Sequence, residues 1–81
     1  MVLDPHTAIV AELVKLLVEL RKQRGLSQET LASRARLSHA GIGHMESGRT
    51  TPTLLLLLKI ASVLEVDLFK LLRKAEQRVV T

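Results

Sequence analysis

The sequence predicts an all-α fold of five short helices, and three observations support this fold class. Apolar residues recur every three or four positions through most of the 81-residue chain, which is the period of an amphipathic helix. An Asp, Ser or Thr, residues that cap helix N-termini, precedes each of the apolar segments. The chain is 47% hydrophobic with one aromatic residue, so its core is aliphatic. Its length of 81 residues suits a single domain. We expect one domain over residues 1–81, with its core in residues 9–72.

The first helix is predicted to begin at Asp4-Pro5, an N-cap followed by proline at the first helical position. It runs to about Gln23, and Gly25 follows at the position where glycine commonly ends a helix. The charged residues of this helix fall on one face, at Glu12, Lys15, Glu19 and Lys22. The remaining apolar arc is wider than the core of one monomer needs.

Four shorter helices follow with short connections. Their expected N-caps are Ser27, Ser38, Thr53 and Asp67, and they span about residues 27–34, 38–47, 54–64 and 67–77. Chain termini are often poorly ordered, so residues 78–81 are expected to form a frayed tail.

The net charge of +4 lies in one central segment. Residues 21–50 contain six basic residues against two acidic ones, and the rest of the chain is balanced. A basic segment of this kind is typical of a surface that binds a polyanion such as nucleic acid. The alternative is a solvated face that only aids solubility.

Several classes of protein are disfavoured by what the sequence lacks. No cysteine is present, so there is no disulfide and no Cys-based zinc site. The lack of disulfides is compatible with a reduced, intracellular setting. No apolar run is long enough to span a membrane, and charges interrupt the N-terminal apolar stretch as they do not in a signal peptide. The sequence contains no carboxylates paired at catalytic spacing and no Gly-rich phosphate loop, so nothing in it indicates an enzyme. We expect a cytoplasmic protein without catalytic activity, metal or other cofactor.

Two of the predicted helices are separated by only Ala35-Arg36-Leu37, which is the spacing of a helix-turn-helix unit over residues 27–47. Around this unit, in order, stand Gly25-Leu26-Ser27-Gln28-Glu29-Thr30-Leu31-Ala32, Leu37-Ser38, Ile42, Glu46, Gly48, Pro52 and Leu64-Glu65-Val66-Asp67. Together they resemble the phage-repressor-like (XRE, lambda-repressor-like) helix-turn-helix family from about residue 17 to residue 72. The resemblance implies a five-helix DNA-binding domain of that type.

The resemblance also implies contacts with the DNA backbone. The expected phosphate contacts are Ser27, Gln28, Arg34, Arg36, Ser38 and Arg49. Each has a structural alternative: a polar residue in the first helical turn, a cap alone, or a solvated arginine. Arg36 departs from the family, which usually has glycine there. It either adopts a left-handed conformation, with a strain of about 1 kcal/mol, or the turn is locally different.

Base reading is expected from the outward positions of the third helix, which are His39, Ala40, Gly41, Gly43 and His44. Family members commonly carry Gln, Arg, Ser or Thr there. Two glycines cost this helix roughly 1 kcal/mol each relative to alanine. The glycines either permit a close approach of the backbone to DNA or are substitutions that the fold tolerates without a function. The histidines either donate hydrogen bonds to the DNA or are exposed without a role in binding. A spacing of five separates the two histidines by about 140° around a helix, which disfavours a shared metal site.

The family pairs an Arg at the end of the first helix with a Glu at the end of the third, and Arg21 and Glu46 match these positions. We therefore expect a partly buried salt bridge with a structural role between them.

The sequence also favours self-association. Leu55, Leu56 and Phe69 stand where family members generally carry polar residues, and Leu16 and Val18 do so on the first helix. Such surplus apolar residues suggest a covered patch. We expect a homodimer with Leu55, Leu56 and Phe69 at its interface, or else a monomer whose first helix covers these residues.

The function predicted is a sequence-specific transcriptional regulator of the repressor or restriction–modification controller type. It would read the major groove of an inverted-repeat operator as a homodimer, with no evident small-molecule effector. The alternative is a protein-interaction module, such as an antitoxin, that docks a protein partner and contacts DNA only secondarily.

Overall fold

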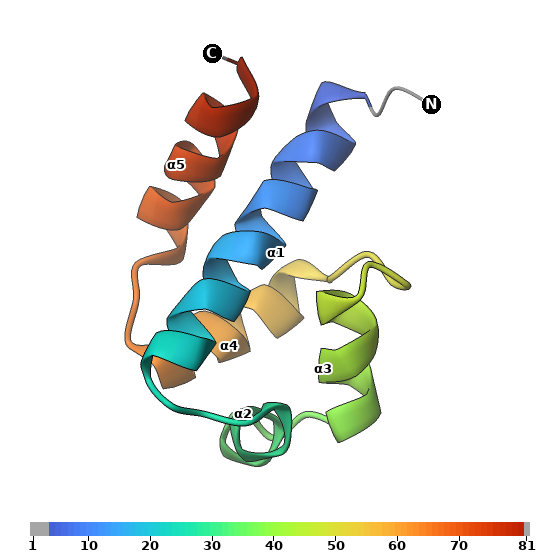
Figure 1. Ribbon diagram of the computed structural model, residues 1–81, viewed down its shortest axis with the longest axis vertical. Helices are drawn as coiled ribbons and strands as arrows, with labels where there is room; N and C mark the ends of the chain where they lie inside the picture. The colour runs from blue at the N-terminus through green and yellow to red at the C-terminus, as the bar shows by residue number, and fades with distance from the viewer. Residues whose placement is uncertain (1–3, 81) are drawn as a thin grey trace.

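The computed structural model describes residues 4–80, and this part of the chain is five α-helices without a strand (Figure 1). The helices are α1 (Pro5–Gln23), α2 (Gln28–Ala35), α3 (His39–Glu46), α4 (Leu54–Leu64) and α5 (Leu68–Val80). The all-α, five-helix prediction is therefore confirmed. Within residues 4–80, no helix combines the length and the apolar character that a membrane span requires.

A capping side chain precedes the first residue of every helix, as the sequence predicts. Asp4, Ser27, Ser38 and Thr53 each accept a hydrogen bond from the backbone N–H three residues later, at 2.9–3.1 Å. Asp67 accepts from the N–H groups of Phe69 and Lys70. These bonds satisfy donors that a helix start otherwise leaves without partners. At Asp4, bonds from the backbone and the hydroxyl of Thr7 also lower the pKa of the carboxyl below its ordinary value.

Four helix ends share one hydrogen-bond pattern. A residue with positive φ donates to the carbonyl three positions back, and the next residue donates to the carbonyl five positions back. Glycine fills the positive-φ position after α1 (Gly25) and α3 (Gly48). Arg36 (φ 56°) fills it after α2 and Glu65 (φ 55°) after α4. Arg36 thus has the left-handed conformation considered from the sequence, and Glu65 has the same conformation, which was not predicted there.

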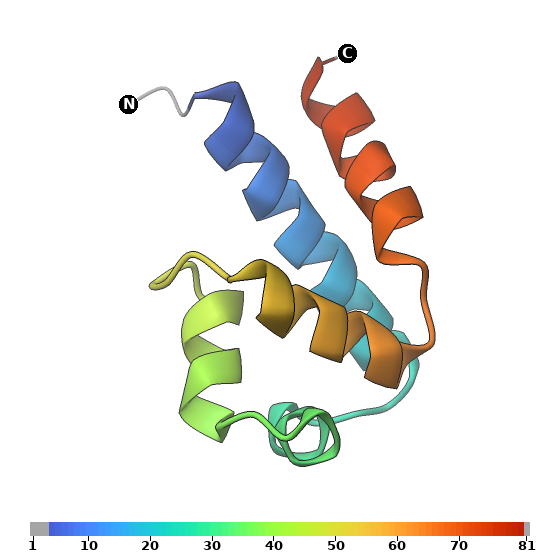
Figure 2. The same cartoon turned by 180° about the vertical axis from the view of Figure 1, so that it is seen from behind.

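The core lies where α1 meets the other helices. α1 contacts α3, α4 and α5, and α2 contacts α3 and α4. Seen from the opposite side, α4 crosses in front of α1 and leads into α5 (Figure 2). The largest fully buried side chains come from four helices: Leu17, Leu31, Ile42, Met45, Ile60 and Leu64. The short helices α2 and α3 depend on this packing, because isolated helices of eight residues are not stable in water.

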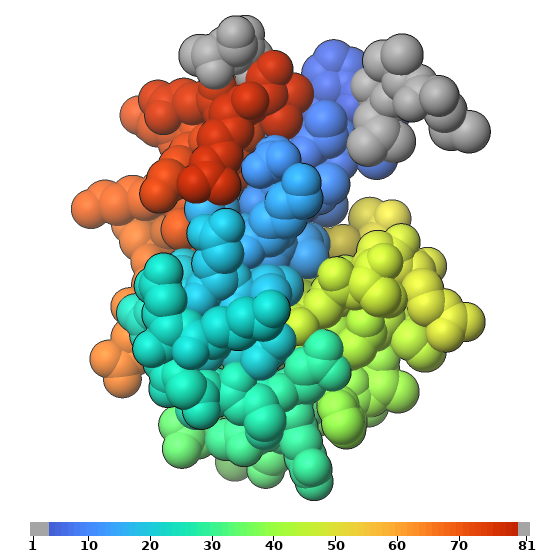
Figure 3. Space-filling model, in the orientation of Figure 1, coloured from blue at the N-terminus to red at the C-terminus, as the bar shows by residue number. Residues whose placement is uncertain are grey.

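The last helix runs further than predicted, into the residues expected to form a frayed tail. α5 continues to Val80, so residues 78–80 are helical, and only Thr81 of the predicted tail lies outside the described residues. Ala75 is completely buried, which extends the core beyond residue 72. α5 lies against α1 (Figure 3), and Arg78 Nη1 comes within 3.7 Å of Glu12 Oε2. This long-range packing of the C-terminal turns was not visible in the local pattern.

The surplus of apolar residues is also smaller than predicted. Leu16 is buried, and Val18 and Leu56 are partly buried against the core, so these three are not free surface. The wide apolar arc of α1 is used because α5 covers it on one side while α3 and α4 cover it on another. The large apolar residues that remain exposed are Leu54, Leu55, Leu58, Phe69 and Leu72.

The two left-handed residues give a stability prediction. Arg36→Gly and Glu65→Gly should each raise the free energy of unfolding by about 1 kcal/mol, because glycine adopts positive φ without the Cβ clash. Urea denaturation of each variant measures this. Arg34→Gly, inside helical α2, is the matched control and should lower the free energy of unfolding by about 1 kcal/mol. Equal destabilisation by all three glycines would contradict the assigned strain.

Candidate nucleic-acid interface

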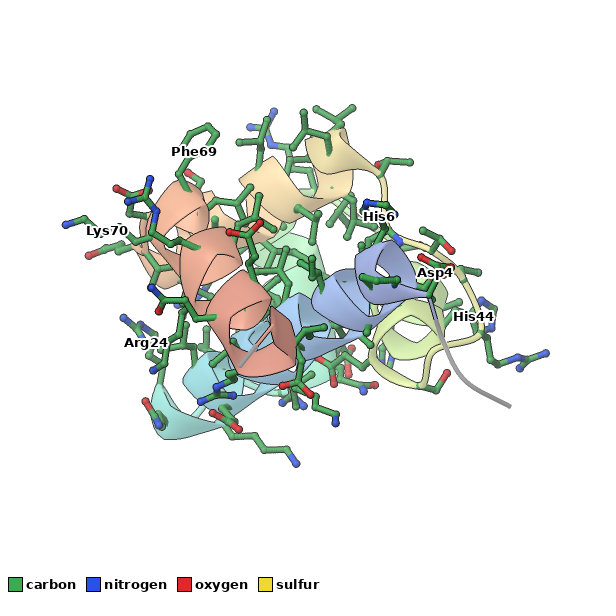
Figure 4. All side chains as sticks on the ribbon, turned by 90° about the horizontal axis from the view of Figure 1, so that it is seen from above. Asp4, His6, Arg24, His44, Phe69 and Lys70 are labelled. Atoms are coloured by element: carbon green, nitrogen blue, oxygen red, sulfur yellow. The ribbon has the colours of Figure 1, made fainter. Side chains whose placement is uncertain are left out.

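The helix α3 is attached to the domain by one face and presents the other to solvent. Ile42 and Met45 anchor it, with 0% and 2% of their surfaces exposed. His39 and Ala40 are exposed, and Gly41, Gly43 and His44 are partly exposed. His44 projects outward at the edge of the molecule (Figure 4). All five predicted base-contact residues therefore keep accessible surface on α3.

The two glycines of α3 differ in what surrounds them. A Cβ at Gly41 would lie 2.8 Å from Ser38 Oγ, the atom that caps α3, so glycine there leaves room for the cap. A Cβ at Gly43 would lie at an ordinary 3.6 Å from Gln28 Oε1. Neither glycine has positive φ. The cap of α3 thus explains why glycine stands at position 41, whereas the fold would accept a side chain in place of Gly43.

Four of the six predicted phosphate contacts stand at the N-terminal ends of α2 and α3 or just beyond the end of α3. Ser27 and Ser38 are exposed N-caps, and Arg49 is exposed two residues beyond the α3 C-cap. Gln28 begins α2, and its Nε2 donates to Glu46 Oε1 at 2.9 Å. These positions place polar side chains and helix N-terminal N–H groups at the ends of the two helices of the unit.

The other two predicted phosphate contacts lie at the C-terminal end of α2. Arg34 and Arg36 line a groove between α2 and α4, together with Lys59. No residue of α3 lines this groove. None of the other four predicted phosphate contacts lines this groove.

Arg21 and Glu46 form a buried ion pair that joins the end of α1 to the end of α3. Arg21 Nε lies 2.7 Å from Glu46 Oε2, and Arg21 Nη2 lies 2.9 Å from Glu46 Oε1. Their side chains are 9% and 8% exposed. Arg21 Nη1 also donates to the backbone carbonyl of Leu26 at 2.7 Å. Such a two-pronged contact fixes the orientation of both groups as well as their distance.

The basic excess is distributed over more than one face. Since Glu46 neutralises Arg21, the exposed cations of the central segment are Lys22, Arg24, Arg34, Arg36 and Arg49. Arg24 and His44 lie on opposite sides of the molecule (Figure 4). The α3 surface is thus less basic than the charge of the segment as a whole suggests.

Comparison with known proteins agrees with this arrangement. The model of the helix-turn-helix family HTH_3 matches residues 17–71. The chain belongs to this family. Family membership supports a DNA-binding regulator, and no curated protein gives a significant match to the chain.

Two solved structures are similar to this helix-turn-helix protein. The restriction-modification controller protein C.AhdI from Aeromonas hydrophila is 36% identical with a TM-score of 0.70, over 78% of this chain and 94% of that one. An HTH_3 family transcriptional regulator from Vibrio cholerae is 35% identical with a TM-score of 0.69. That match covers 89% of this chain, which spans only 39% of the regulator.

Sequence reasoning missed one contact and one grouping of residues in this helix-turn-helix domain. The bond from Gln28 to Glu46 was not expected, because Gln28 was interpreted either as a phosphate contact or as a polar residue of the first helical turn. The grouping of Lys59 with Arg34 and Arg36 was missed as well, although Lys59 interrupts an otherwise apolar run from Leu54 to Ala61. A charge inside such a run is a signal that this side of the helix faces solvent or a polar partner.

The buried pair gives a second stability prediction. Glu46→Ala should lower the free energy of unfolding by about 3–5 kcal/mol, because it leaves the Arg21 guanidinium buried without its carboxylate. Lys15→Ala, which removes only the exposed pair with Glu12, is the control and should change it by less than about 1 kcal/mol. Thermal and urea unfolding compare the two. If both variants lowered the free energy of unfolding by similar amounts, the buried pair of Arg21 and Glu46 would be no more important for stability than an exposed pair.

Proposed function

We propose that this protein is a transcriptional regulator that binds a specific DNA site as a homodimer, of the repressor or restriction–modification controller type. The observation that carries the proposal is α3, which is anchored on one side and open on the other. A helix about 10–12 Å across fits a major groove about 12 Å wide. The similarity to a controller protein over 94% of that protein's length supports the controller type.

Base reading is assigned to the exposed face of α3. The imidazoles of His39 and His44 supply N–H donors for acceptor atoms such as guanine N7 and O6. Ala40, Gly41 and Gly43 add little bulk between them, so the backbone of α3 can approach the base edges closely. In this assignment two side chains form hydrogen bonds with the bases, and three small residues allow the helix backbone to lie close to them.

Backbone contacts are assigned to the ends of α2 and α3. Ser27, Gln28 and Ser38 lie at helix N-termini, where free N–H groups favour a phosphate. Arg49 adds a full positive charge beyond the C-terminal end of α3. These contacts position the protein without selecting a sequence.

Dimerisation is assigned to the exposed apolar residues of α4 and α5. Phe69 is 72% exposed, and Leu54 and Leu55 are each 64% exposed. Phe69 also borders a groove whose apolar lining continues through Leu72 to Ile9 of α1. Leu56, which packs against the core, contributes at most its exposed edge. Two-fold symmetry would place two α3 helices about 34 Å apart, facing an inverted repeat.

A protein-interaction module remains the second candidate, because the same apolar residues suit a different protein partner. An antitoxin-like role would require tight binding of that partner and sequence-blind binding of DNA.

Selection from a random duplex library at about 150 mM salt tests the function, since at this salt non-specific binding is weak. Recovered sites should contain an inverted repeat with half-sites one helical turn apart. The logarithm of the affinity should fall with the logarithm of salt concentration by about 0.9 per phosphate contacted. Recovery of no enriched site by the folded protein would instead favour the interaction module.

Single variants, carried through the same selection, distinguish base contacts from phosphate contacts. His44→Phe should change the enriched sequence, whereas Gln28→Ala should weaken all sites alike. Lys70→Ala, on exposed α5, is the control and should leave both affinity and sequence unchanged. A change of sequence preference in Gln28→Ala would contradict its assignment to phosphate.

The dimer is tested by Phe69→Lys, measured by sedimentation velocity. Burying an unpaired ammonium in an apolar interface is unfavourable, so this variant should sediment as a monomer where the parent protein is a dimer. Lys70→Ala again serves as the control, because it changes the neighbouring exposed residue only. If Phe69→Lys sediments as the parent does, the interface lies elsewhere.

A further inference from the structure

A second surface stands apart from α3, in the groove between α2 and α4. We define the basic groove by its three cationic residues, Arg34, Arg36 and Lys59, and its two larger apolar residues, Leu58 and Val63. The two arginines come from the end of α2 and the turn after it, and the other three residues come from α4. Docking of α2 on α4 therefore brings together charges that are more than 20 positions apart in the sequence.

The positive charge of the basic groove is uncompensated. No acidic residue lines it. Within residues 4–80, none of its three cations takes part in an ion pair. Other exposed cations of the described chain, such as Lys22, Arg24 and Arg49, also lack an ion pair, but those three are not gathered around this groove. Three like charges around one hollow are complementary to an anionic ligand.

Arg36 is also held in an unfavourable backbone conformation. Its φ of 56° suits glycine, which fills the equivalent position after α1 and α3. The chain instead carries a long cationic side chain there. Local strain of this kind commonly marks a position whose side chain has a function.

The apolar part of the groove distinguishes between classes of anion. Leu58 is 42% exposed and Val63 is partly exposed, and the lining between the two helices includes the buried Ala35. A DNA backbone offers phosphates but little apolar surface to cover two such side chains. A peptide helix with carboxylates flanking leucines offers both.

We propose that the basic groove binds an acidic amphipathic segment of a partner protein. Carboxylates of the segment pair with Arg34, Arg36 and Lys59, and its apolar residues cover Leu58 and Val63. Arginine is suited to this because its guanidinium binds a carboxylate through two parallel hydrogen bonds. Because no residue of α3 lines the groove, such a partner can be held while α3 remains open.

The test uses a synthetic peptide of Glu, Leu and Ala, about 12 residues or three helical turns long, with leucines on one face. It is added to the full chain and followed by backbone amide chemical shifts and by fluorescence anisotropy. Shift changes should concentrate at residues 34–36 and 58–63. A peptide with Gln in place of every Glu is the ligand control and should bind more weakly.

One double variant probes the groove without endangering the fold, and one variant outside the groove is its control. The double variant Arg36→Gly, Lys59→Ala should weaken peptide binding about fivefold or more, since two exposed charge pairs are lost. Arg36→Gly relieves a strained residue, so the loss would not reflect unfolding. Lys70→Ala, an exposed cation outside the groove, is the matched control and should leave binding unchanged.

Binding of duplex DNA is measured for the same variants. Peptide shifts spread over other surfaces, or equal binding of the Gln peptide, would overturn the proposal. So would a loss of DNA affinity with a salt slope lower by about one per charge removed, because it would assign the groove to phosphate. Failure of the DNA selection alone leaves the result at the groove unaffected, so the two proposals fail separately.

Discussion

The position of α3 depends on one buried ion pair. Arg21 and Glu46 are almost fully removed from solvent, and two charges in such surroundings are tolerated only if their hydrogen bonds are satisfied. Here every arm of the Arg21 guanidinium has a partner, two on Glu46 and one on the Leu26 carbonyl. The pair thus links the end of α1, the turn before α2 and the end of α3. A short α3 with two glycines has little helical stability of its own, so its orientation follows from this link and from the burial of Ile42 and Met45.

The local features of the fold could be predicted from the sequence because their causes are local. Each N-cap is one side chain acting on an N–H two or three residues away, so Ser27, Ser38 and Thr53 mark helix starts by themselves. The end of α5 was placed too early because its last turns are supported by α1, far away in the sequence. The same reason applies to Leu16 and Val18, which look superfluous in the sequence but pack into or against a core that several helices build. Periodicity shows which residues share a face, but not how many neighbours that face has.

The candidate site shows a similar division. Arg21 and Glu46 could be paired in advance because both positions match a family pattern, and the accessible residues of α3 follow from the helical period once Ile42 and Met45 are taken as buried. The association of Arg34 and Arg36 with Lys59 could not be predicted, since it depends on how α2 docks against α4. Central basic charge in the sequence therefore did not mean one basic face. The structure divides it between a buried pair, the ends of the helix-turn-helix unit, and a separate groove.

Gln28 shows how the buried pair and the proposed DNA contact fit together. Its bond to Glu46 at first looks like competition, because the same amide is assigned to a phosphate. A carboxamide nitrogen carries two hydrogens, however, and the bond to Glu46 uses only one. The second N–H can donate to a phosphate while the first keeps the side chain oriented. Glu46 thereby orients both the helix proposed to read bases and the residue proposed to contact the DNA backbone, so that the position of one relative to the other is set by the fold itself.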